Sequence, residues 1–213
     1  MGPMMEMRIL YRDEAVLAVD KPAGLLSVPG RGPDKADCAI ARALQLCPDA
    51  LVVHRLDMGT SGILVFGRGL AAQRALSRAF EQRLAHKRYE AVVAGQLDRA
   101  DGQVELPLRC DWPNRPRQMV DPELGKPALT RWERLSVDPV ADRSRVALFP
   151  LTGRSHQLRV HLMALGHPIL GDELYAPPER VAQAPRLLLH AARLELPHPV
   201  TGEPLVVESP VPF

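Results

Sequence analysis

The sequence has few cysteines, few aromatic residues and no long apolar run. Its three cysteines (Cys38, Cys47 and Cys110) show no C-x-x-C spacing. This argues against a disulfide scaffold and a cysteine-rich zinc site, and it favours a reducing compartment. No stretch approaches the roughly 18 unbroken apolar residues of a membrane span. The N-terminus also lacks the apolar segment of a signal peptide and the serine or threonine of a myristoylation signal. We therefore expect a cytoplasmic protein with no membrane partner.

The length of 213 residues, 46% of them hydrophobic, predicts a sizeable core in one domain or two small ones. Net charge is only +2, but it is unevenly distributed. Three arginines stand against six acids from Asp172 to Phe213, whereas the segment from His54 to Arg88 carries two acids and seven basic residues: Arg55, Arg68, Arg74, Arg78, Arg83, Lys87 and Arg88. A basic middle beside an acidic tail indicates one face for a polyanion, with solvated helix faces as the alternative.

Hydrophobic periodicity predicts more strands than helices. Helices are expected at 39–46, 70–84 and 156–165, the second because Leu76, Phe80 and Leu84 recur every four residues. Segment 110–128 is expected to be a loop or hairpin. Strands are expected on both sides of a turn at Asp13-Glu14, near 52, and at 63–66, 87–95, 130–135, 145–148 and 187–191. Because the strands are not regularly separated by helices, we expect an α+β fold with a largely antiparallel sheet.

The segment HRLDMGTSG, residues 54–62, lies between two apolar strand segments. Asp57 is therefore expected in a loop at a strand end, where glycines allow close backbone approach. A carboxylate in such a place can act as a nucleophile or a base. The structural alternative is a turn in which Asp57 only accepts N–H bonds from Gly59 or Thr60.

Several other chemistries are not supported by the motifs present. His156 and His161 are five residues apart, whereas zinc ligands on a helix are spaced i and i+4, so no metal site is expected. Ser61 lacks the G-x-S-x-G pattern of a hydrolase elbow, and no Walker or dinucleotide loop occurs.

The segment Gly153-Arg154-Ser155 precedes the helix expected at 156–165. Such a helix start can bind an anion, or it can simply be capped by Ser155 or Thr152. Within the helix, Arg159 lies beside a stripe expected to be buried, formed by Leu158, Leu162 and Leu165. A partly buried arginine needs a carboxylate partner, for which Asp57 is a candidate.

Tyr89 follows two cations, Lys87 and Arg88, at the start of an expected strand. It is either a stacking platform for a nucleobase or a half-buried residue of the sheet.

Together these segments resemble the RluA family of pseudouridine synthases over nearly the whole chain. The resemblance rests on several motifs in the family's order: Lys21-Pro22-Ala23-Gly24, residues 54–62, Lys87-Arg88-Tyr89, TGRSHQLRVH at 152–161 and GHPILGD at 166–172.

The resemblance implies a role for each matching residue. Asp57 would be the catalytic carboxylate, kept ionised by Arg159, and the base would be flipped out of the RNA before reaction. Arg55 would fill the space vacated in the RNA, and Tyr89 would pack on the flipped base. Further RNA contacts are expected at His54, Thr60, Arg88, Arg115, Arg117, Arg154 and His156.

The resemblance also implies a single catalytic domain over residues 1–213, made of two half-domains with a long, bent, mostly antiparallel sheet and a central cleft. No N-terminal S4 domain is expected. Segments 26–31 and 110–116 resemble those of members that modify both 23S ribosomal RNA and the tRNA anticodon stem-loop, with a tRNA-only synthase as the alternative. The chain is expected to act as a monomer, with no ATP, metal or redox cofactor.

Two other classes stay open on the residues alone. A catalytically silent RNA-binding module would tolerate loss of Asp57. A glycosidic hydrolase would need a second carboxylate at a defined spacing.

Overall fold

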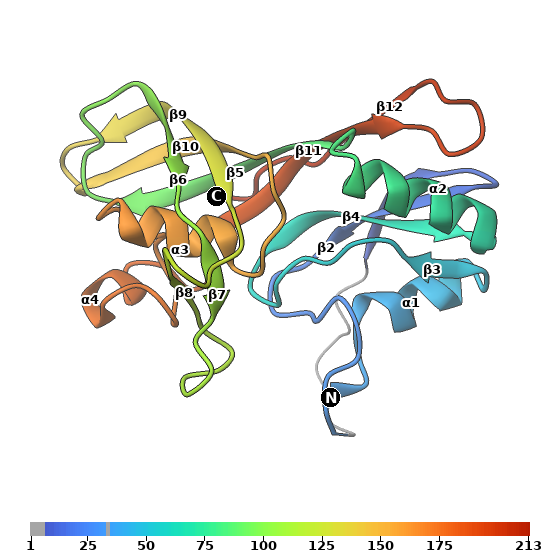
Figure 1. The fold of residues 1–213 in the computed structure, drawn as a ribbon, viewed down its shortest axis with the longest axis horizontal. Helices are drawn as coiled ribbons and strands as arrows, with labels where there is room; N and C mark the ends of the chain where they lie inside the picture. The colour runs from blue at the N-terminus through green and yellow to red at the C-terminus, as the bar shows by residue number, and fades with distance from the viewer. Residues whose placement is uncertain (1–6, 33–34) are drawn as a thin grey trace. The chain divides into compact units, whose positions relative to one another are not determined.

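The structure, a computed structural model, describes residues 7–32 and 35–213, and these fall into two units. The first unit combines the chain up to Lys87 with Ala191–Pro212, and the second comprises Arg88–His190 with Phe213. The chain therefore leaves the first unit, builds the second and returns (Figure 1).

The first unit is a sheet covered by two helices. The order of its strands is β1-β2-β4-β11, with β3 paired to β4 and β12 to β11. Helix α2 packs on β3 and β4, and α1 packs on β3. The bounds are β1 Arg8–Arg12, β2 Val16–Lys21, α1 Ala39–Leu46, β3 Ala50–Val52, β4 Ser61–Arg68, α2 Gly69–Glu81, β11 Leu189–Pro197 and β12 Pro204–Glu208. The described register of each pair β1–β2, β2–β4, β3–β4 and β11–β12 is antiparallel.

A tight turn at Asp13 joins β1 to β2. The Asp13 carboxylate accepts the N–H groups of Ala15 and Val16 at 2.8 and 2.7 Å and the Tyr11 hydroxyl at 2.7 Å. His198, in the turn between β11 and β12, contacts the same carboxylate through Nε2 at 2.8 Å. These bonds lower the pKa of Asp13 to about 2, although burial opposes them. One carboxylate thus holds two turns of the unit that are 185 residues apart.

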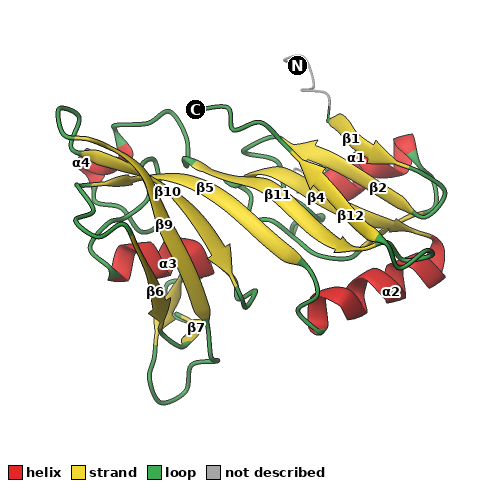
Figure 2. Cartoon of the chain, turned by 90° about the horizontal axis from the view of Figure 1, so that it is seen from above, coloured by secondary structure: helices red, strands yellow, loops and turns green. Residues whose placement is uncertain are grey.

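The second unit has the strand order β5-β10-β9-β6, with a separate hairpin of β7 and β8. Helix α3 packs against β8, β9 and β10. Figure 2 shows α3 beside β9 of this unit. The bounds are β5 His86–Ala94, β6 Asp101–Glu105, β7 Leu108–Cys110, β8 Gln118–Val120, β9 Leu129–Asp138, β10 Arg143–Pro150, α3 Gln157–Ala164 and α4 Pro178–Val181. The pairs β5–β10, β9–β10, β6–β9 and β7–β8 are all antiparallel.

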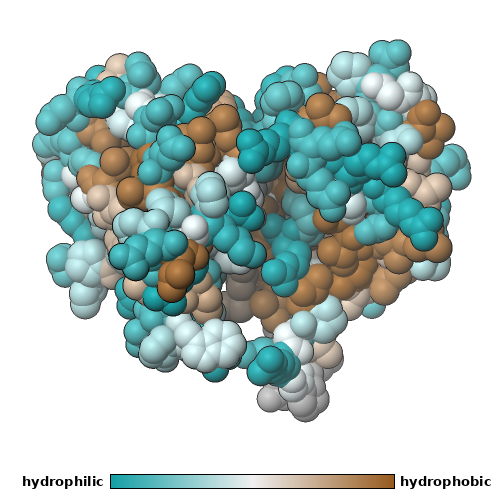
Figure 3. Space-filling view, viewed as in Figure 1, coloured by the Kyte–Doolittle hydropathy of each residue, from teal (hydrophilic) through white to brown (hydrophobic). Residues whose placement is uncertain are grey.

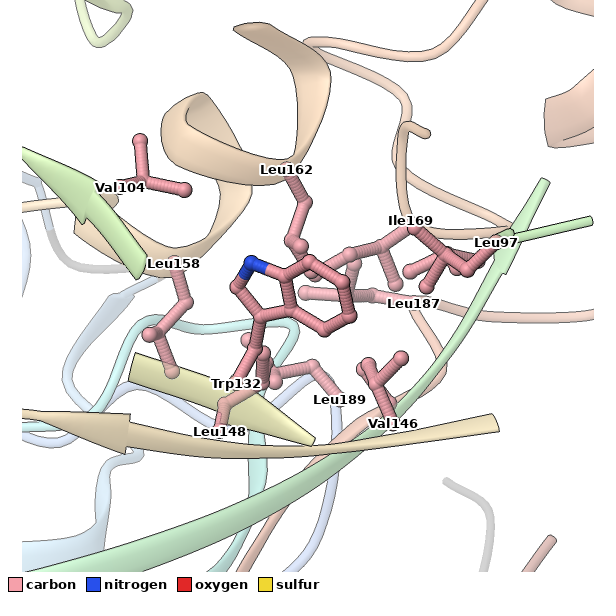
Figure 4. Close-up of a cluster of buried hydrophobic side chains, with 12 residues drawn as sticks. Leu97, Val104, Trp132, Val146, Leu148, Leu158, Leu162, Ile169, Leu187 and Leu189 are labelled. Atoms are coloured by element: carbon pink, nitrogen blue, oxygen red, sulfur yellow. The ribbon is translucent and has the colours of Figure 1, made fainter. Parts of the chain in front are cut away.

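The main core of the second unit lies between its sheet and α3. Leu158 and Leu162 of α3 meet Trp132 of β9 and Val146 and Leu148 of β10 (Figure 4). The indole of Trp132 packs against Gly102 of β6, where a Cβ atom would lie 2.8 Å from the ring. The glycine therefore makes room for the largest side chain of this core.

The predicted α+β class with mostly antiparallel strands is confirmed, and so is the expected helix at 39–46. Segment 110–128, expected to be a loop or hairpin, takes part in a hairpin whose first strand, β7, already starts at Leu108. Three details were wrong. The helix expected to reach Leu84 ends at Glu81, because Arg83 adopts a left-handed φ of 61°, and Leu84 is 46% exposed. Leu165, expected to be buried, is 37% exposed and follows the end of α3. Strands β6 and β12 were not expected. No described helix has the length and apolar character needed to cross a membrane.

Candidate active site

The loop that carries Asp57 connects β3 to β4 in the first unit. Leu56 is buried, and its backbone forms two hydrogen bonds with Ser27: the hydroxyl donates to Leu56 O at 2.7 Å and accepts its N–H at 3.0 Å. Thr60 is also buried, and its N–H donates to the Asp57 carbonyl at 3.1 Å. Asp57 lies between these anchors and is partly exposed, and Arg55, which precedes Leu56, is exposed. The loop is therefore held at Leu56 and Thr60 and presents a carboxylate and a guanidinium to solvent.

A buried lysine braces the same loop from a second segment. Lys21 has no exposed surface, and its ammonium donates to the carbonyls of Leu25 at 2.7 Å, Pro22 at 3.0 Å and Met58 at 3.2 Å. The Gly24 N–H donates to the same Met58 carbonyl at 2.8 Å. Three carbonyl dipoles compensate the desolvated charge. The Lys-Pro-Ala-Gly segment thus fixes the backbone one residue beyond Asp57.

His54 supports the loop as a neutral side chain. Its ring stacks on Phe80 of α2 with centroids 4.6 Å apart, and Nε2 accepts the Val65 N–H at 3.0 Å. Burial, and to a smaller extent the positive charge of Lys87, lowers the pKa of His54 from 6.5 to about 3. The imidazole is therefore uncharged at neutral pH. Its expected contact with RNA stays a prediction.

Gly62, the second residue of β4, lies at a point of close backbone approach. Its φ is +107°, and a Cβ atom there would lie 2.3 Å from the carbonyl oxygen of Ala191 in β11. No other residue type fits without moving β11. The glycine after Thr60-Ser61 thus fixes where the loop re-enters the sheet.

In the second unit, Arg159 of α3 is held by Asp172. The guanidinium donates through Nε and Nη2 to the two carboxylate oxygens at 2.8 and 2.7 Å, and both side chains are buried. Asp172 also accepts the N–H groups of Leu174 and Tyr175. The expectation that Arg159 needs a carboxylate was therefore sound, and within this unit Asp172 is that carboxylate. Pairing of Arg159 with Asp57 stays a proposal.

The start of α3 differs from both caps that the sequence suggested. His156 occupies the N-cap position with a left-handed φ of 53°, and its side chain makes no capping bond. Thr152 and Ser155 do not cap the helix either: the Thr152 hydroxyl donates to the Gln157 amide oxygen at 2.7 Å. That oxygen also accepts the Arg154 N–H at 3.0 Å, while Gln157 Nε2 donates to Leu129 O and Thr130 Oγ1 at 3.0 Å each. The predicted caps fail because Thr152 is engaged by the buried Gln157 amide, which ties the segment before α3 to β9.

His156 and Arg154 flank this turn. His156 Nδ1 lies 2.6 Å from the Tyr175 hydroxyl, and the two rings meet edge to face. Arg154 is exposed, and its Nε donates to the Pro127 carbonyl at 3.1 Å. Both candidate RNA contacts are therefore held at one end of α3.

Tyr89 lies in β5 opposite Leu148 of β10 and is half-buried against the core of the second unit. Arg88 beside it forms an ion pair with Glu90 at 2.7 Å. This matches the half-buried alternative for Tyr89, and its packing on a flipped base stays a proposal.

Arg115 and Arg117 are both exposed in the loop that joins β7 to β8. The Arg117 guanidinium lies 5.4 Å from the centre of the Tyr175 ring. The hydroxyl of Tyr175 accepts the N–H of Gln118 at 2.7 Å and so ties this hairpin to the segment after α3.

The comparisons with known proteins agree with one another. The family described as RNA pseudouridylate synthase matches residues 15–164. The chain is 52% identical over 206 residues to the dual-specificity RNA pseudouridine synthase RluA of Escherichia coli strain K12, covering 96% of this chain and 93% of that protein. It is 48% identical over 205 residues to the Haemophilus influenzae protein of the same name, with the same coverage. The chain belongs to the RNA pseudouridylate synthase family.

Solved structures support this assignment. Human RNA pseudouridylate synthase domain containing 1 superposes with a TM-score of 0.83 at 30% identity, over all of this chain and 87% of that one. The corresponding human domain-containing 4 protein gives a TM-score of 0.77 at 25% identity, over 96% and 88% of the two chains. The pseudouridine synthase is thus an enzyme that isomerises uridine in RNA.

Four residues that support the site in this pseudouridine synthase had no predicted role. Three of them belong to the sequence motifs and are buried: Lys21, Gln157 and Asp172. Polar side chains in apolar surroundings need partners, so knowledge of their burial would have identified them. The fourth, Tyr175, lies outside the motifs, and no sequence pattern pointed to it. Among the described residues, no group of three or more His, Cys, Asp or Glu side chains is arranged to hold a metal ion.

Proposed function

We propose that this pseudouridine synthase modifies specific uridines in stem-loops of 23S ribosomal RNA and in the anticodon stem-loop of tRNA, with Asp57 as the catalytic carboxylate. The observation that carries the proposal is the braced loop 54–62, which leaves Asp57 partly exposed in the first unit while Leu56 and Thr60 on either side are buried. Support for two substrates comes from the relatives that share about half of the residues and are named dual-specificity synthases. A tRNA-only synthase is the alternative.

The proposed reaction separates uracil from its ribose and rejoins it through carbon 5. The carbon–nitrogen glycosidic bond breaks, a carbon–carbon bond forms, and the proton on carbon 5 is finally lost. Asp57 acts as an ionised group, either as nucleophile toward the sugar or base or as the base that removes the ribose 2′ proton. Arg159, whose orientation Asp172 fixes, supplies the positive charge that favours the ionised carboxylate.

The remaining residues act on the RNA. Extruding a uridine costs a few kcal/mol of stacking. Arg55 is exposed beside Asp57 and fills the vacated space, while Tyr89 packs on the extruded base. Phosphates are bound by Arg88, Arg115, Arg117 and Arg154, and His54, Thr60 and His156 shape the site.

The deciding experiment incubates the protein with unmodified tRNA and 23S fragments and maps pseudouridine by carbodiimide treatment and primer extension. Modification of one stem-loop uridine in both RNAs is the expected result, and modification of tRNA alone would favour the alternative. Asp57→Asn should reduce turnover about 1,000-fold or more, because an amide can neither attack nor take a proton. Its thermal unfolding should match the wild type. Turnover retained by Asp57→Asn, or unchanged by Arg55→Ala or Tyr89→Leu, would remove that residue from the site.

We also propose that the enzyme works as a monomer in the cytoplasm. The three cysteines support a reducing compartment, since none forms a disulfide and two of them are buried. Sedimentation of the purified chain and fractionation of cells that express it test the two statements separately.

A further inference from the structure

The loop that joins β7 to β8 exposes an aromatic side chain. All nine aromatic residues of the chain lie in the described ranges, and Trp112 alone among them is exposed, at 66%. An exposed tryptophan offers a flat aromatic face on which a nucleobase can stack. Figure 1 shows this loop extending beyond the paired strands β7 and β8.

The indole is already stacked on one cation. The Arg115 guanidinium lies 3.9 Å from the centre of the Trp112 ring. Arginine stacks on aromatic faces and still directs N–H donors outward, which suits a phosphate next to a base. Arg117, also exposed, adds a second positive charge two residues further on.

The tip is also held in one conformation before any ligand arrives. Asp111 N–H donates to Arg117 O, Asn114 N–H to Asp111 O and Arg117 N–H to Asn114 O, each at 3.0 Å. The Asn114 amide donates to both carboxylate oxygens of Asp111 at 3.1 and 3.0 Å. Below the tip, Arg109 pairs with Asp121, and Gln118 is bonded to Tyr175. Ordering the loop on binding therefore costs little.

We propose that Trp112 and Arg115 form a nucleobase-stacking site that binds an unpaired base of the RNA substrate away from the uridine being isomerised. This stacking site rests on the proposed function. Within that function, Trp112 selects RNA that has an unstacked loop nucleotide. The loop's two arginines outnumber its single acid, Asp111, which favours a polyanion over an apolar protein surface as the occupant. Base-on-indole stacking tolerates any base, so the site recognises a loop rather than a sequence.

Fluorescence tests the stacking directly because the chain has only two tryptophans. Trp132 is buried in the core, so Trp132→Phe leaves Trp112 as the sole reporter. Titration with a single-stranded oligouridylate should quench its emission. A blunt RNA duplex or inorganic polyphosphate should bind with little quenching, because neither offers an unstacked base. Equal quenching by all three, quenching by an acidic peptide alone, or none would overturn the proposal. If Trp132→Phe folds poorly, subtracting the emission of Trp112→Phe from that of wild type isolates the Trp112 signal instead.

Binding and turnover of an anticodon stem-loop RNA supply the second test. Trp112→Ala should raise Kd and KM about 5- to 150-fold, the range expected for loss of one stacked base. Trp112→Phe should stay within about three-fold of wild type because it keeps an aromatic face. Leu124→Ala is the matched control, since Leu124 is a 73% exposed side chain in the segment after β8. A Trp112→Ala enzyme that binds this RNA as tightly as the control would contradict the site.

The two proposals fail separately. Quenching by oligouridylate without pseudouridine in any RNA would refute the proposed function and leave the stacking site in place. Pseudouridine formation with unchanged binding by Trp112→Ala would refute the stacking site alone.

Discussion

His54 and Thr60, which flank Asp57, hold its loop through neutral contacts. His54 accepts a backbone N–H and stacks on Phe80, and Thr60 closes a backbone turn. Asp57 is the single acidic residue of segment 54–62, which suits a carboxylate that must be ionised to react.

Acid should therefore destabilise the protein through His54. Its pKa in the folded state, about 3, lies below the unfolded value of 6.5, so the unfolded chain binds more protons between these pH values. Stability is full above pH 6.5 and falls as the pH drops toward 3, by at most about 1.4 kcal/mol per pH unit. His54→Gln keeps a hydrogen-bond acceptor but does not titrate. Urea unfolding at about pH 7 and about pH 5 should show a larger loss for wild type than for this variant. Equal losses would mean that the imidazole becomes protonated without cost.

Some features of the site were predictable at the residue scale and others were not. The exposure of Asp57 followed from a polar, glycine-containing segment between two apolar strands. The partner of Arg159 did not, because Asp172 comes from a turn 13 residues away and sequence spacing does not fix which carboxylate a helix meets. Burial creates the need for a partner, and only the packing identifies it.

Among the elements, the start of α3 depends most on one side chain. Gln157 is 4% exposed, and both ends of its amide are bonded, to segment 152–154 on one side and to β9 on the other. It thereby holds Arg154 and the strained backbone of His156 in place. A left-handed φ at a residue other than glycine costs roughly 1 kcal/mol and persists only where its surroundings enforce it.

Gln157→Leu should lower the free energy of unfolding by about 2–4 kcal/mol. The apolar side chain has a similar size but removes all four hydrogen bonds of the buried amide, two to β9 and two to segment 152–154. The fall in RNA affinity should exceed that caused by a variant of equal stability loss elsewhere in the second unit, such as Leu162→Ala in the core. Chemical denaturation and RNA titration of both variants make the comparison. If Gln157→Leu binds RNA no worse than Leu162→Ala, the amide supports folding only.

The elements that the sequence missed share a cause. Strand β6 buries Val104 alone among its five residues, so its apolar pattern is too weak to stand out. Strand β12 alternates, with Leu205 and Val207 buried, but it is short and lies among prolines and turn residues. Each is recruited by backbone hydrogen bonds to a longer neighbour, β9 or β11. Pairing of this kind depends on tertiary context more than on local propensity.

On the scale of the whole molecule, the basic segment carries less available charge than its composition suggests. Of its seven cations, Arg68 pairs with Asp49 and Arg88 with Glu90, and burial lowers the pKa of Lys87. The four exposed ones are Arg55, Arg74, Arg78 and Arg83. Figure 3 shows hydrophilic side chains over much of one face, with smaller hydrophobic patches between them. Folding thus selects which charges remain for a polyanion.

RNA binding should consequently weaken with salt, and Arg74, Arg78 and Arg83 should contribute phosphate contacts in addition to those proposed for Arg88, Arg115, Arg117 and Arg154. Each phosphate contact on single-stranded RNA contributes about 0.7 to the slope of log K against log salt. Four such contacts alone predict about a 50-fold loss of affinity between roughly 50 and 200 mM salt, and further contacts increase it. Arg74→Gln and Arg78→Gln, one turn apart on α2, should each reduce the slope by about one contact. Titrations of an anticodon stem-loop RNA at several salt concentrations measure these slopes.

Arg12→Gln is the control, because Arg12 is an exposed arginine of the same unit that lies on β1, outside the basic segment. Its slope should equal that of wild type, so any difference from Arg74→Gln and Arg78→Gln reflects where the charge lies rather than net charge. A flat salt dependence of the wild type would refute the basic face altogether. Equal slopes for all three variants would show that the RNA responds to total charge, and α2 would then lose its role as a phosphate-binding surface.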